Sequence, residues 1–537
     1  MPVPIAFLQV VDSGGGSRAP MASLFATKPL ATLTEEANEQ GAHTLKRTLG
    51  PINLITLGVG AVIGAGIFVL TGQAAALHAG PAVALSFVLA GVTCAFAGLC
   101  YAEFASIIPI AGSAYTYGYA TLGELVAWII GWDLVLEYAF GAATVAYGWS
   151  GYFVSLLAQM HIDLPPQLTA TFGSSLYFYD HQWIPVASLP KAAHTAGLPH
   201  VTGSFNLVAF AVLLLVTAVL VVGIQESANF NSAIVVVKVA IVGLFIVLGS
   251  AYLFHHPGLA QANWHPFIPP AQGPGRYGFN GIAAGAASVF FAYIGFDAVS
   301  TAAQEARNPQ RDMPLGLLGS LLLCTLLYIL VSLVLTGLVN YTKLDVAAPV
   351  ALGIDATGVR WGGFVVKLGA VLGLGSVMLV MLLGQSRVFY SMSRDGLLWR
   401  WASAIHPRFR TPWISNIVVG TIVAFLPAML PIERLAELVN IGTLLAFTIV
   451  CAGVWILRRR HPELKRPFKT PLVPLTPILG MLSALYLMFK LPEITWVVLF
   501  VWLAIGLVIY FSYGVKHSKV RAASLVGLAS TPSDRIG

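Results

Sequence analysis

Apolar residues fill most of this chain in long runs that short polar segments separate. No Asp, Glu, Lys or Arg occurs between Arg47 and Glu103, and a turn at residues 78–81 divides that run into two stretches. A helix needs about 20 apolar residues to cross a bilayer, so the run predicts two membrane-spanning helices. The sequence does not alternate apolar and polar residues in short strands, which argues against an outer-membrane barrel.

Hydropathy along the whole chain predicts an all-α polytopic membrane protein with twelve transmembrane helices. We expect a segment of residues 1–50 before the first span, a transporter domain over residues 51–513 and a tail over residues 514–537. Met21 is an alternative start of the native chain, which would leave out residues 1–20. The predicted spans cover residues 53–77, 81–108, 123–159, 205–223, 231–254, 279–303, 315–340, 361–390, 413–430, 435–457, 472–490 and 494–513.

Composition and charge support this topology. The chain is 57% hydrophobic and only 9% charged, whereas a soluble domain carries about 25% charged residues. With the N-terminus in the cytoplasm, most of the 29 Lys and Arg residues fall in the two terminal segments and the cytoplasmic loops. The positive-inside rule therefore predicts a multi-pass protein of the inner (plasma) membrane with both termini cytoplasmic. The net charge of +7 reflects this topology and does not indicate nucleic-acid binding.

The first span is rich in glycine, although a glycine inside a helix costs about 1 kcal/mol relative to alanine. Gly64-Ala65-Gly66 places two glycines within three positions, more closely than a packing groove would need. This spacing favours a helix that is interrupted in the middle of the membrane, where exposed N–H groups could bind a carboxylate. Close helix packing through small residues is the alternative interpretation.

The sixth predicted span also mixes glycine with apolar residues, and its core runs from Phe291 to Asp297. The first and sixth spans are five apart. Interrupted helices at corresponding positions of two halves indicate a binding site near the bilayer midplane of an inverted-repeat transporter. An aromatic packing face around Phe290 and Phe291 is the alternative.

Charged residues inside a membrane are costly and usually functional. Lys238 is the only formal charge between Glu226 and Arg276. A desolvated lysine can load and release a proton, although a lysine that reaches the inner interface is the alternative. Glu137 lies one turn after Asp133 on the same helix face. It could orient a substrate amine, order a water or hold the interrupted helix, and a carboxylate that binds nearby backbone groups is an equal alternative.

Four segments make the chain resemble a known family. They are LKRTLGPINLITLGVGAVIGAGIFVLTG (residues 45–72), the fifth span with Lys238, FFAYIGFDAVSTAAQEARNPQRDMP (residues 290–314) and GQSRVFYSMSRDGLLW (residues 384–399). They are similar to the amino acid–polyamine–organocation superfamily, and within it to bacterial members of the cationic amino acid transporter family. The likeness extends over nearly the whole chain.

The resemblance implies the leucine-transporter-like fold with broken helices 1 and 6. Residues 51–254 and 279–457 would form a 5+5 inverted repeat, and residues 472–513 would add helices 11 and 12. The fold also implies how the two charged groups of an amino acid would be bound. N–H groups at the interruption of the first span would hold the substrate α-carboxylate, and carbonyls of the sixth span would accept the α-ammonium.

The resemblance also implies roles for individual residues. Lys238 would be the proton-coupling lysine, Phe291 an aromatic lid over the substrate, and the eighth span would face the substrate side chain. The expected substrate-binding residues are Ile63, Gly64, Ala65, Gly66, Ile67, Phe291, Ala292, Ile294, Glu137 and Met378, and the expected cytoplasmic gate or structural residues are Asp297, Glu305, Asn308 and Arg394.

Together these observations predict a secondary active amino acid transporter that works by proton-coupled alternating access. The expected pocket has no extra carboxylate placed for an Arg or Lys side chain, and Met378 and Met381 are bulky. Small to medium neutral L-amino acids are therefore favoured. A cationic amino acid or polyamine transporter or exchanger is the alternative, and an amino acid sensor is a further one.

Other classes of protein fit less well. The glycine spacing at residues 58–64 departs from G-x-G-x-x-G and lacks a strand–turn–helix context, which argues against a dinucleotide-binding enzyme. No HExxH or comparable set of catalytic residues occurs in the predicted spans, and no pore-filter segment repeats. We therefore expect no enzymatic activity, no cofactor and no metal. The expected partners are an amino acid, protons and the lipid bilayer, with a small accessory single-helix protein kept as an option.

Overall fold

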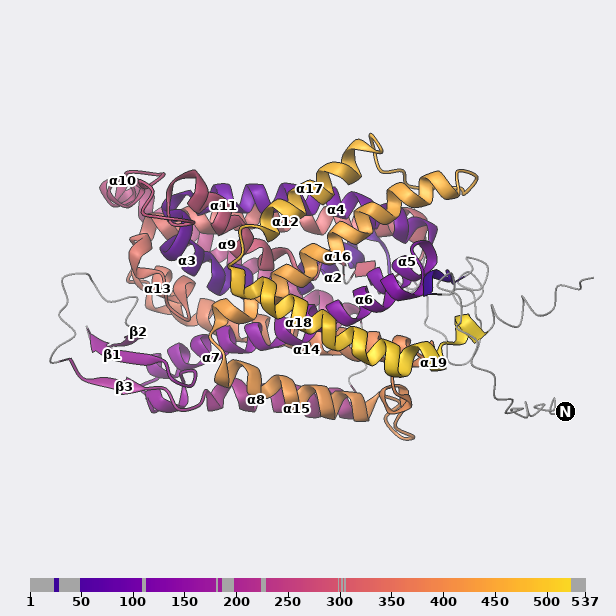
Figure 1. The fold of residues 1–537 in the computed structure, drawn as a ribbon. Coiled ribbons are helices and arrows are strands. Elements are labelled where there is room, and N and C mark those ends of the chain that lie inside the picture. Colours follow the sequence, from indigo (N-terminus) through magenta and orange to yellow (C-terminus); the bar gives the residue numbers. More distant parts are fainter. Residues whose placement is uncertain are drawn as a thin grey trace, which may run out of the picture.

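The computed structural model of this chain is predominantly helical, and most of its helices run along one common direction (Figure 1). The longest helices are formed by the apolar runs of the sequence, as expected for a chain that buries its backbone polar groups within a membrane. The structure describes residues 24–28, 49–108, 113–179, 182–185, 198–223, 228–297, 299–300, 303 and 306–522.

The first half of the chain contains α-helices joined by short π-helical or 3-10 segments, which are labelled η. The elements are α2 (Pro51–Val62), η2 (Gly66–Leu70), α3 (Thr71–Ala74), η3 (Ala75–Ala79), η4 (Gly80–Ala82), α4 (Val83–Ile107), α5 (Ser113–Thr121), α6 (Glu124–Val135), η5 (Leu136–Phe140), α7 (Gly141–Gln159), η6 (Pro166–Leu168), α8 (Leu207–Val222), α9 (Ala228–His255) and α10 (Pro257–Trp264).

The second half is built in the same way. Its elements are α11 (Gly278–Val289), η8 (Phe290–Tyr293), α12 (Pro309–Leu338), η10 (Tyr341–Lys343), α13 (Pro349–Asp355), α14 (Arg360–Arg394), η11 (Arg400–Ser403), α15 (Trp413–Met429), α16 (Ile432–Arg460), α17 (Leu475–Met488), α18 (Glu493–Ile509), η12 (Tyr510–Gly514) and α19 (Val515–His517).

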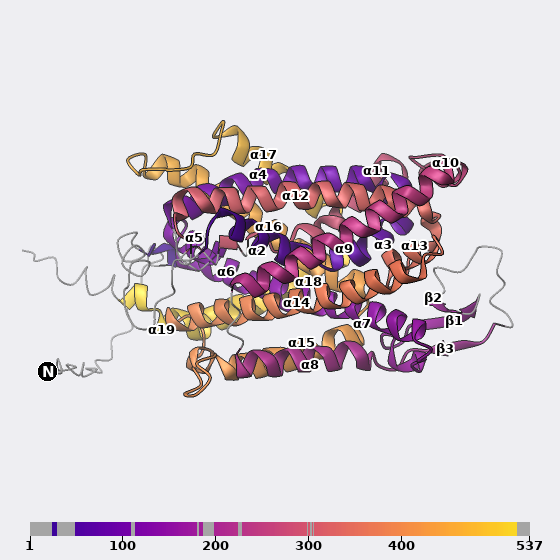
Figure 2. The same ribbon diagram turned by 180° about the vertical axis from the view of Figure 1, so that it is seen from behind.

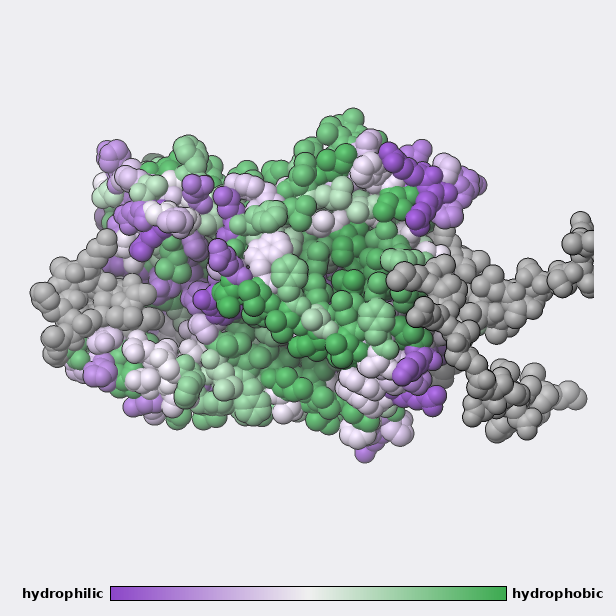
Figure 3. Space-filling view, in the orientation of Figure 1, coloured by the Kyte–Doolittle hydropathy of each residue, from purple (hydrophilic) through white to green (hydrophobic). Residues whose placement is uncertain are grey.

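Several of these helices are suited to a bilayer. Side chains such as Leu322 and Phe500 are 74% and 62% exposed, which is favourable in lipid and costly in water. Figure 3 shows a hydrophobic band across the middle of the molecule, with hydrophilic residues towards both ends. Within the described residues, five shorter apolar helices accompany seven stretches that are long and apolar enough to cross a membrane: Gly66–Ile107, Glu124–Gln159, Ile234–His255, Pro309–Leu338, Arg360–Arg394, Ile432–Arg460 and Glu493–His517. The chain is therefore a multi-pass membrane protein.

Helices that are far apart in the sequence pack side by side. α4 packs on α12 along one margin of the molecule, and α8 packs on α15 along the opposite margin (Figures 1 and 2). In the interior, α14 packs on α7 and α9, and α2 packs on α12. Glycine allows the closest approach: a Cβ added to Gly369 in α14 would lie 1.8 Å from Cδ1 of Ile241 in α9.

A small antiparallel sheet interrupts the otherwise helical fold. β1 (Ser175–Tyr179) lies between β2 (Gln182–Pro185) and β3 (His200–Thr202), and Tyr177 pairs with Ile184 in the register of the first two strands. These strands lie between the predicted spans 123–159 and 205–223, where the sequence predicts no membrane helix. The sheet forms because the SLYFY run of β1 is rich in aromatic residues, which favour extended backbone.

A buried ion pair connects the end of α4 to the last turn of α16, and the segment after α16 adds further contacts. Glu103 is fully buried and accepts two hydrogen bonds from Arg458, at 3.0 Å to Oε1 and 2.6 Å to Oε2. The N–H of Thr470 donates to the same carboxylate at 2.7 Å, and Nε of Arg466 lies 3.4 Å from Oε1. A bidentate pair of this kind fixes orientation as well as distance.

Residues from both ends of the described chain meet at the corner between α5 and α6. Lys28 forms an ion pair with Asp395 at 3.2 Å, just after α14. Glu124, at the start of α6, is fully buried and accepts hydrogen bonds from the hydroxyls of Tyr119 and Tyr510, at 2.8 and 2.9 Å. Its carboxylate also accepts from the hydroxyl of Ser518. We call this set of contacts the Glu124 corner.

Candidate functional site

The backbone of the first span changes course at Ile63 and Gly64. α2 ends at Val62, the backbone of Ile63 is extended (φ −72°, ψ 95°), and the π-helical segment η2 begins at Gly66. The N–H of Phe68 donates to the carbonyl of Gly64 at 3.3 Å. The first N–H groups of a helix have no carbonyl partner within that helix, and they carry the positive end of its dipole. This arrangement can bind an anionic group such as a carboxylate.

The apolar helix α11 ends in a comparable way. α11 ends at Val289, the 3-10 segment η8 follows, and the backbone of Ile294 is extended (φ −63°, ψ 137°). Gly295 then adopts φ +104°, a conformation that favours glycine. A Cβ added there would lie 3.0 Å from the carbonyl oxygen of Ala61, so this segment passes directly against α2.

The two changes of course contact each other. A Cβ added to Gly66 would lie 2.2 Å from the Cα atom of Ala292, so η2 and η8 touch through their backbones. The hydroxyl of Tyr328 in α12 lies 2.9 Å from the carbonyl oxygen of Val62 and 2.7 Å from that of Ala292. A phenol hydroxyl has one proton, so the two carbonyls share this donor. Tyr328 is not among the site residues predicted from the sequence, although a tyrosine within an apolar helix needs a partner for its hydroxyl.

Lys238 in α9 lies beside the end of α2. Its side chain is 1% exposed, and its ammonium donates to the carbonyl of Gly60 at 2.8 Å. The stem of the lysine packs against α14, where a Cβ added to Gly373 would lie 3.3 Å from Cγ of Lys238. The last carbonyls of a helix have no partner within that helix, so a buried ammonium is a suitable partner for them.

Glu137 lies in the π-helical segment η5 and contacts two other parts of the chain. Its Oε2 accepts a hydrogen bond from Thr443 in α16 at 3.0 Å, and its carboxyl group interacts directly with that of Asp297. Asp133, one turn earlier in α6, faces α16, where a Cβ added to Gly442 would lie 3.0 Å from its Oδ1. The three carboxyl groups are almost fully buried. They form an acidic cluster between α6, α16 and the segment after η8.

Residues of α14 cover the segment between α2 and η2 from one side. A Cβ added to Gly64 would lie 3.3 Å from Cγ1 of Val377, so this valine faces that segment. Met378 and Met381 are 0% and 2% exposed, and Phe291 in η8 is 4% exposed. Val377 was missed because a helical sequence shows the buried face but not which buried residue meets a distant backbone. The site is enclosed by apolar side chains.

The other residues expected at a cytoplasmic gate have separate partners. The carbonyl of Asn308 accepts the N–H of Asp312 at 2.8 Å at the start of α12. Arg394 is exposed, and its guanidinium lies 5.9 Å from the ring centre of Tyr390. Glu305 lies outside the described residues. Among the residues that the structure describes, no group of His, Cys, Asp or Glu is placed to hold a metal ion.

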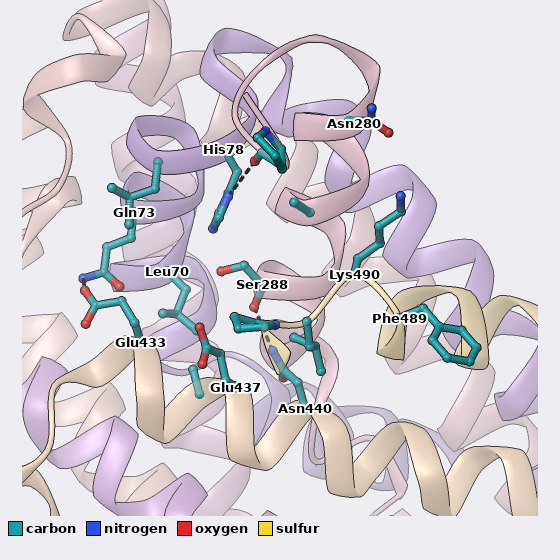
Figure 4. Close-up of a pocket in the computed structure, with 17 residues that line it drawn as sticks. Leu70, Gln73, His78, Asn280, Ser288, Glu433, Glu437, Asn440, Phe489 and Lys490 are labelled. Atoms are coloured by element: carbon teal, nitrogen blue, oxygen red, sulfur yellow. Dashed lines mark hydrogen bonds between the residues drawn. The ribbon is translucent and has the colours of Figure 1, made fainter. Parts of the chain in front are cut away.

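A pocket of about 560 Å³ opens beside η2, α3 and α11 (Figure 4). Its walls come from η2 to η3, α11, the first turns of α16 and the turn between α17 and α18. Leu70 and Ser288 are among the lining residues. Leu70 lies one turn beyond Gly66 and Ser288 one turn before Phe291 in the chain, so the pocket adjoins the enclosed site. We call it the Glu433 pocket after another lining residue.

Comparison with known proteins shows similarity to membrane transporters, most of them named for amino acids. Residues 49–512 match the amino acid permease family. The chain is 44% identical over 498 residues to the methylthioribose transporter of Bacillus subtilis (strain 168), covering 93% of this chain and 99% of that protein. It is 45% identical over 499 residues to the branched-chain amino acid permease BcaP of the same organism, with the same coverage. Cationic amino acid transporter 4, vacuolar, of Arabidopsis thaliana is 38% identical over 423 residues, covering 79% of this chain and 65% of that protein.

These matches confirm the resemblance inferred from the sequence. The two bacterial relatives align over nearly their whole length and are named as transporters, and the family match extends over the apolar helices described above. The chain therefore belongs to the amino acid permease family of the amino acid–polyamine–organocation superfamily, and it is a membrane transporter rather than an enzyme.

Proposed function

We propose that this transporter carries neutral amino acids with branched apolar side chains, such as leucine, into the cell. The observation that carries this proposal is the contact between Gly66 and Ala292, which brings the start of η2 beside the carbonyls of η8. The N–H groups of η2 suit an α-carboxylate, and the carbonyls suit an α-ammonium. Ile63, Gly64, Ala65 and Ile67 would shape the first of these sites, and Phe291 and Ile294 the second.

The side chains around the site support an apolar substrate. Val377, Met378 and Phe291 present only apolar atoms or a thioether, and all three are nearly fully buried. A cationic side chain enclosed there would lose its hydration without gaining a partner, which is costly. The relative that is a branched-chain amino acid permease agrees with this preference.

The transport fold is part of the proposal. The seven long apolar stretches and the five shorter helices would form twelve spans in the leucine-transporter-like arrangement, with helices 1 and 6 discontinuous. Residues 51–254 and 279–457 would be the inverted repeats, and residues 472–513 the two appended helices. Both termini would lie in the cytoplasm. This orientation places the basic residues after α16 and near α19 on the cytoplasmic side, as the positive-inside rule requires.

Proton coupling is assigned to Lys238. A hydrogen bond from a charged donor contributes about 1.5–3 kcal/mol, whereas a neutral one contributes about 0.5–1.5 kcal/mol. Protonated Lys238 therefore holds the carbonyl of Gly60 more firmly than the neutral amine does. Loss of the proton would loosen the end of α2 and favour its movement. In this scheme Glu137 and Asp297 position α16 and the sixth span.

A second candidate substrate is methylthioribose, because a relative with similar identity is named as its transporter. This sugar has neither a carboxylate nor an ammonium group, so it would leave the start of η2 and the carbonyls of η8 without their ionic partners. Cationic amino acids and polyamines, and exchange in place of symport, are further alternatives, with a plant cationic amino acid transporter as the supporting relative.

Uptake into proteoliposomes tests the proposal. Radiolabelled leucine, arginine and methylthioribose would be compared under an inward proton gradient, with empty liposomes as the control. We expect leucine to accumulate and a protonophore to abolish the accumulation. Accumulation of arginine or methylthioribose without leucine would overturn the proposed substrate. Leucine uptake that ignores the protonophore would overturn the coupling.

A further inference from the structure

The polar residues that line the Glu433 pocket include several hydrogen-bond acceptors, set among apolar side chains. Glu433, Glu437 and Asn440 follow one another at helical spacing in α16, so their side chains lie on the same helix face. Gln73 and His78 face them from α3 and η3 (Figure 4). Nδ1 of His78 lies 3.0 Å from the carbonyl of Gly275. A carbonyl only accepts, so Nδ1 is the donor and Nε2 of the neutral ring is an acceptor.

Two buried acceptors in this pocket have no partner among the described residues. Asn440 is 0% exposed, and its Nδ2 donates to the carbonyls of Ala287 and Ser288 at 2.8 and 3.2 Å. Its Oδ1 makes no hydrogen bond, and neither does Oε1 of Gln73, a residue that is 5% exposed. Buried acceptors without donors are unfavourable, so these atoms indicate a ligand that donates hydrogen bonds.

The charges of the pocket favour a cationic ligand group. Oε1 of Glu433 accepts from Nε2 of Gln73 at 2.8 Å, and no ion pair to Glu433 occurs within the described part of the chain. Glu437 pairs with the half-exposed Arg434 at 3.1 Å. The ammonium of Lys490 lies 5.2 Å from the ring centre of Tyr486. Figure 4 shows that the Lys490 side chain is directed away from Glu437.

We propose that the Glu433 pocket is a second binding site, which takes a primary ammonium group between Glu433, Glu437 and Oδ1 of Asn440. The pocket adjoins the enclosed site through Leu70 and Ser288, so an amino acid bound there would be one helical turn from the place where its carboxylate is needed. This inference rests on the proposed function only for the natural ligand. Recognition of the ammonium group itself does not depend on transport.

The test uses 3-methylbutylamine, which is leucine without its carboxylate. Purified full-length protein would be unfolded by heat with increasing amine, because a ligand that binds the folded state raises the unfolding temperature. We expect a saturable rise for the wild type and none for Glu433→Gln. The matched control is Glu493→Gln, which removes an exposed carboxylate next to Pro492, a residue of the pocket rim. This control should behave like the wild type.

Two results would overturn the second site. One is the absence of any shift in the wild type, and the other is an equal shift in Glu433→Gln, which would place the amine elsewhere. Glu437→Gln is the second variant, with the same expectation, and it keeps the test valid if Glu433→Gln does not fold. The anion 4-methylpentanoate, which is leucine without its ammonium, should give no shift that depends on Glu433. If leucine uptake fails while the amine shift persists, only the proposed function is overturned.

Discussion

The ammonium group of Lys238 lies 2.8 Å from the carbonyl oxygen of Gly60, in the last turn of α2 before the backbone changes course. The lysine comes from α9, and its stem rests on α14 at Gly373. One side chain thus connects three helices at the point where the first span leaves its helical course. A change in the charge of this side chain would directly change the strength of its hydrogen bond to α2.

We expect Lys238→Met to abolish leucine accumulation driven by a proton gradient while leucine exchange continues. The substitution keeps an apolar stem of similar length and removes the group that carries the proton. Accumulation and counterflow in proteoliposomes measure the two activities separately. Lys367→Met is the matched control, because Lys367 is 4% exposed and pairs with Asp355 at 2.8 Å. Full gradient-driven accumulation by Lys238→Met would refute the coupling role.

Tyr328→Phe should reduce transport more than it reduces stability. The variant removes the donor shared by the carbonyls of Val62 and Ala292, and one buried hydrogen bond is worth about 1 kcal/mol. Tyr277→Phe is the control, because its hydroxyl donates to the carbonyl of Ala76 at 2.7 Å and Tyr277 is also deeply buried. We expect similar losses of unfolding temperature and a marked loss of leucine uptake for Tyr328→Phe alone. Equal uptake by the two variants would contradict this assignment.

Glu103→Gln should be strongly destabilising. Removal of one partner from a buried ion pair costs about 3–5 kcal/mol, and the partial exposure of Arg458 places the expected effect at the lower end. The unfolding temperature of the purified protein measures the loss. Glu463→Gln is the control, because that carboxylate is 65% exposed and a surface change usually stays within about 0.5 kcal/mol. An unchanged unfolding temperature for Glu103→Gln would show that the pair adds little.

We expect Asp345 to make the stability of the folded protein depend on pH. It lies between η10 and α13, outside the membrane-spanning stretches, and burial raises its pKa although a hydrogen bond from Gln73 opposes the shift. Folding raises the pKa of this carboxyl group, so the group does not destabilise the folded state at pH values below its unfolded pKa. Its unfavourable contribution grows as the pH rises through the folded pKa. Asp345→Asn should therefore raise the unfolding temperature at pH 7.

The gain from Asp345→Asn should shrink as the pH falls towards the usual range of an aspartate. Thermal unfolding of the wild type and the variant across this range measures the difference. Asp163→Asn is the control, because Asp163 is exposed and should show no such trend. A gain that stays constant with pH would mean that the charge of Asp345 is not its source.

The sequence was informative where one residue type carries the signal. The glycines at positions 64 and 66 pointed to the place where α2 ends, since glycine is costly within a helix. The charge of Lys238 singled out a residue that the structure places against the carbonyl of Gly60, and its role in proton coupling stays a prediction. The family also followed from local motifs, and the comparisons confirmed it.

Contacts between segments that are far apart in the chain could not be predicted from the sequence. The approach of Tyr328 to Val62 and Ala292 depends on how α12 packs, which hydropathy does not specify. The same holds for Val377, which meets Gly64 across an interface. The Glu433 pocket combines four separate segments, and its acceptors look like ordinary solvated residues when each is considered alone. Strands β1 to β3 were missed because short aromatic strands in a loop have little periodicity.

The Glu124 corner has a consequence for biosynthesis. Glu124 is made early, but Tyr510 and Ser518 follow it by 386 and 394 residues. Until the ribosome has made the chain as far as Ser518, this carboxylate lacks at least one of these two partners, and the corner between α5 and α6 cannot close around it. A truncated chain that stops before Ser518 would keep that corner unfinished. The packing of the first third of the chain thus depends on residues made as late as Ser518, so quality control would meet an open corner in any shorter chain.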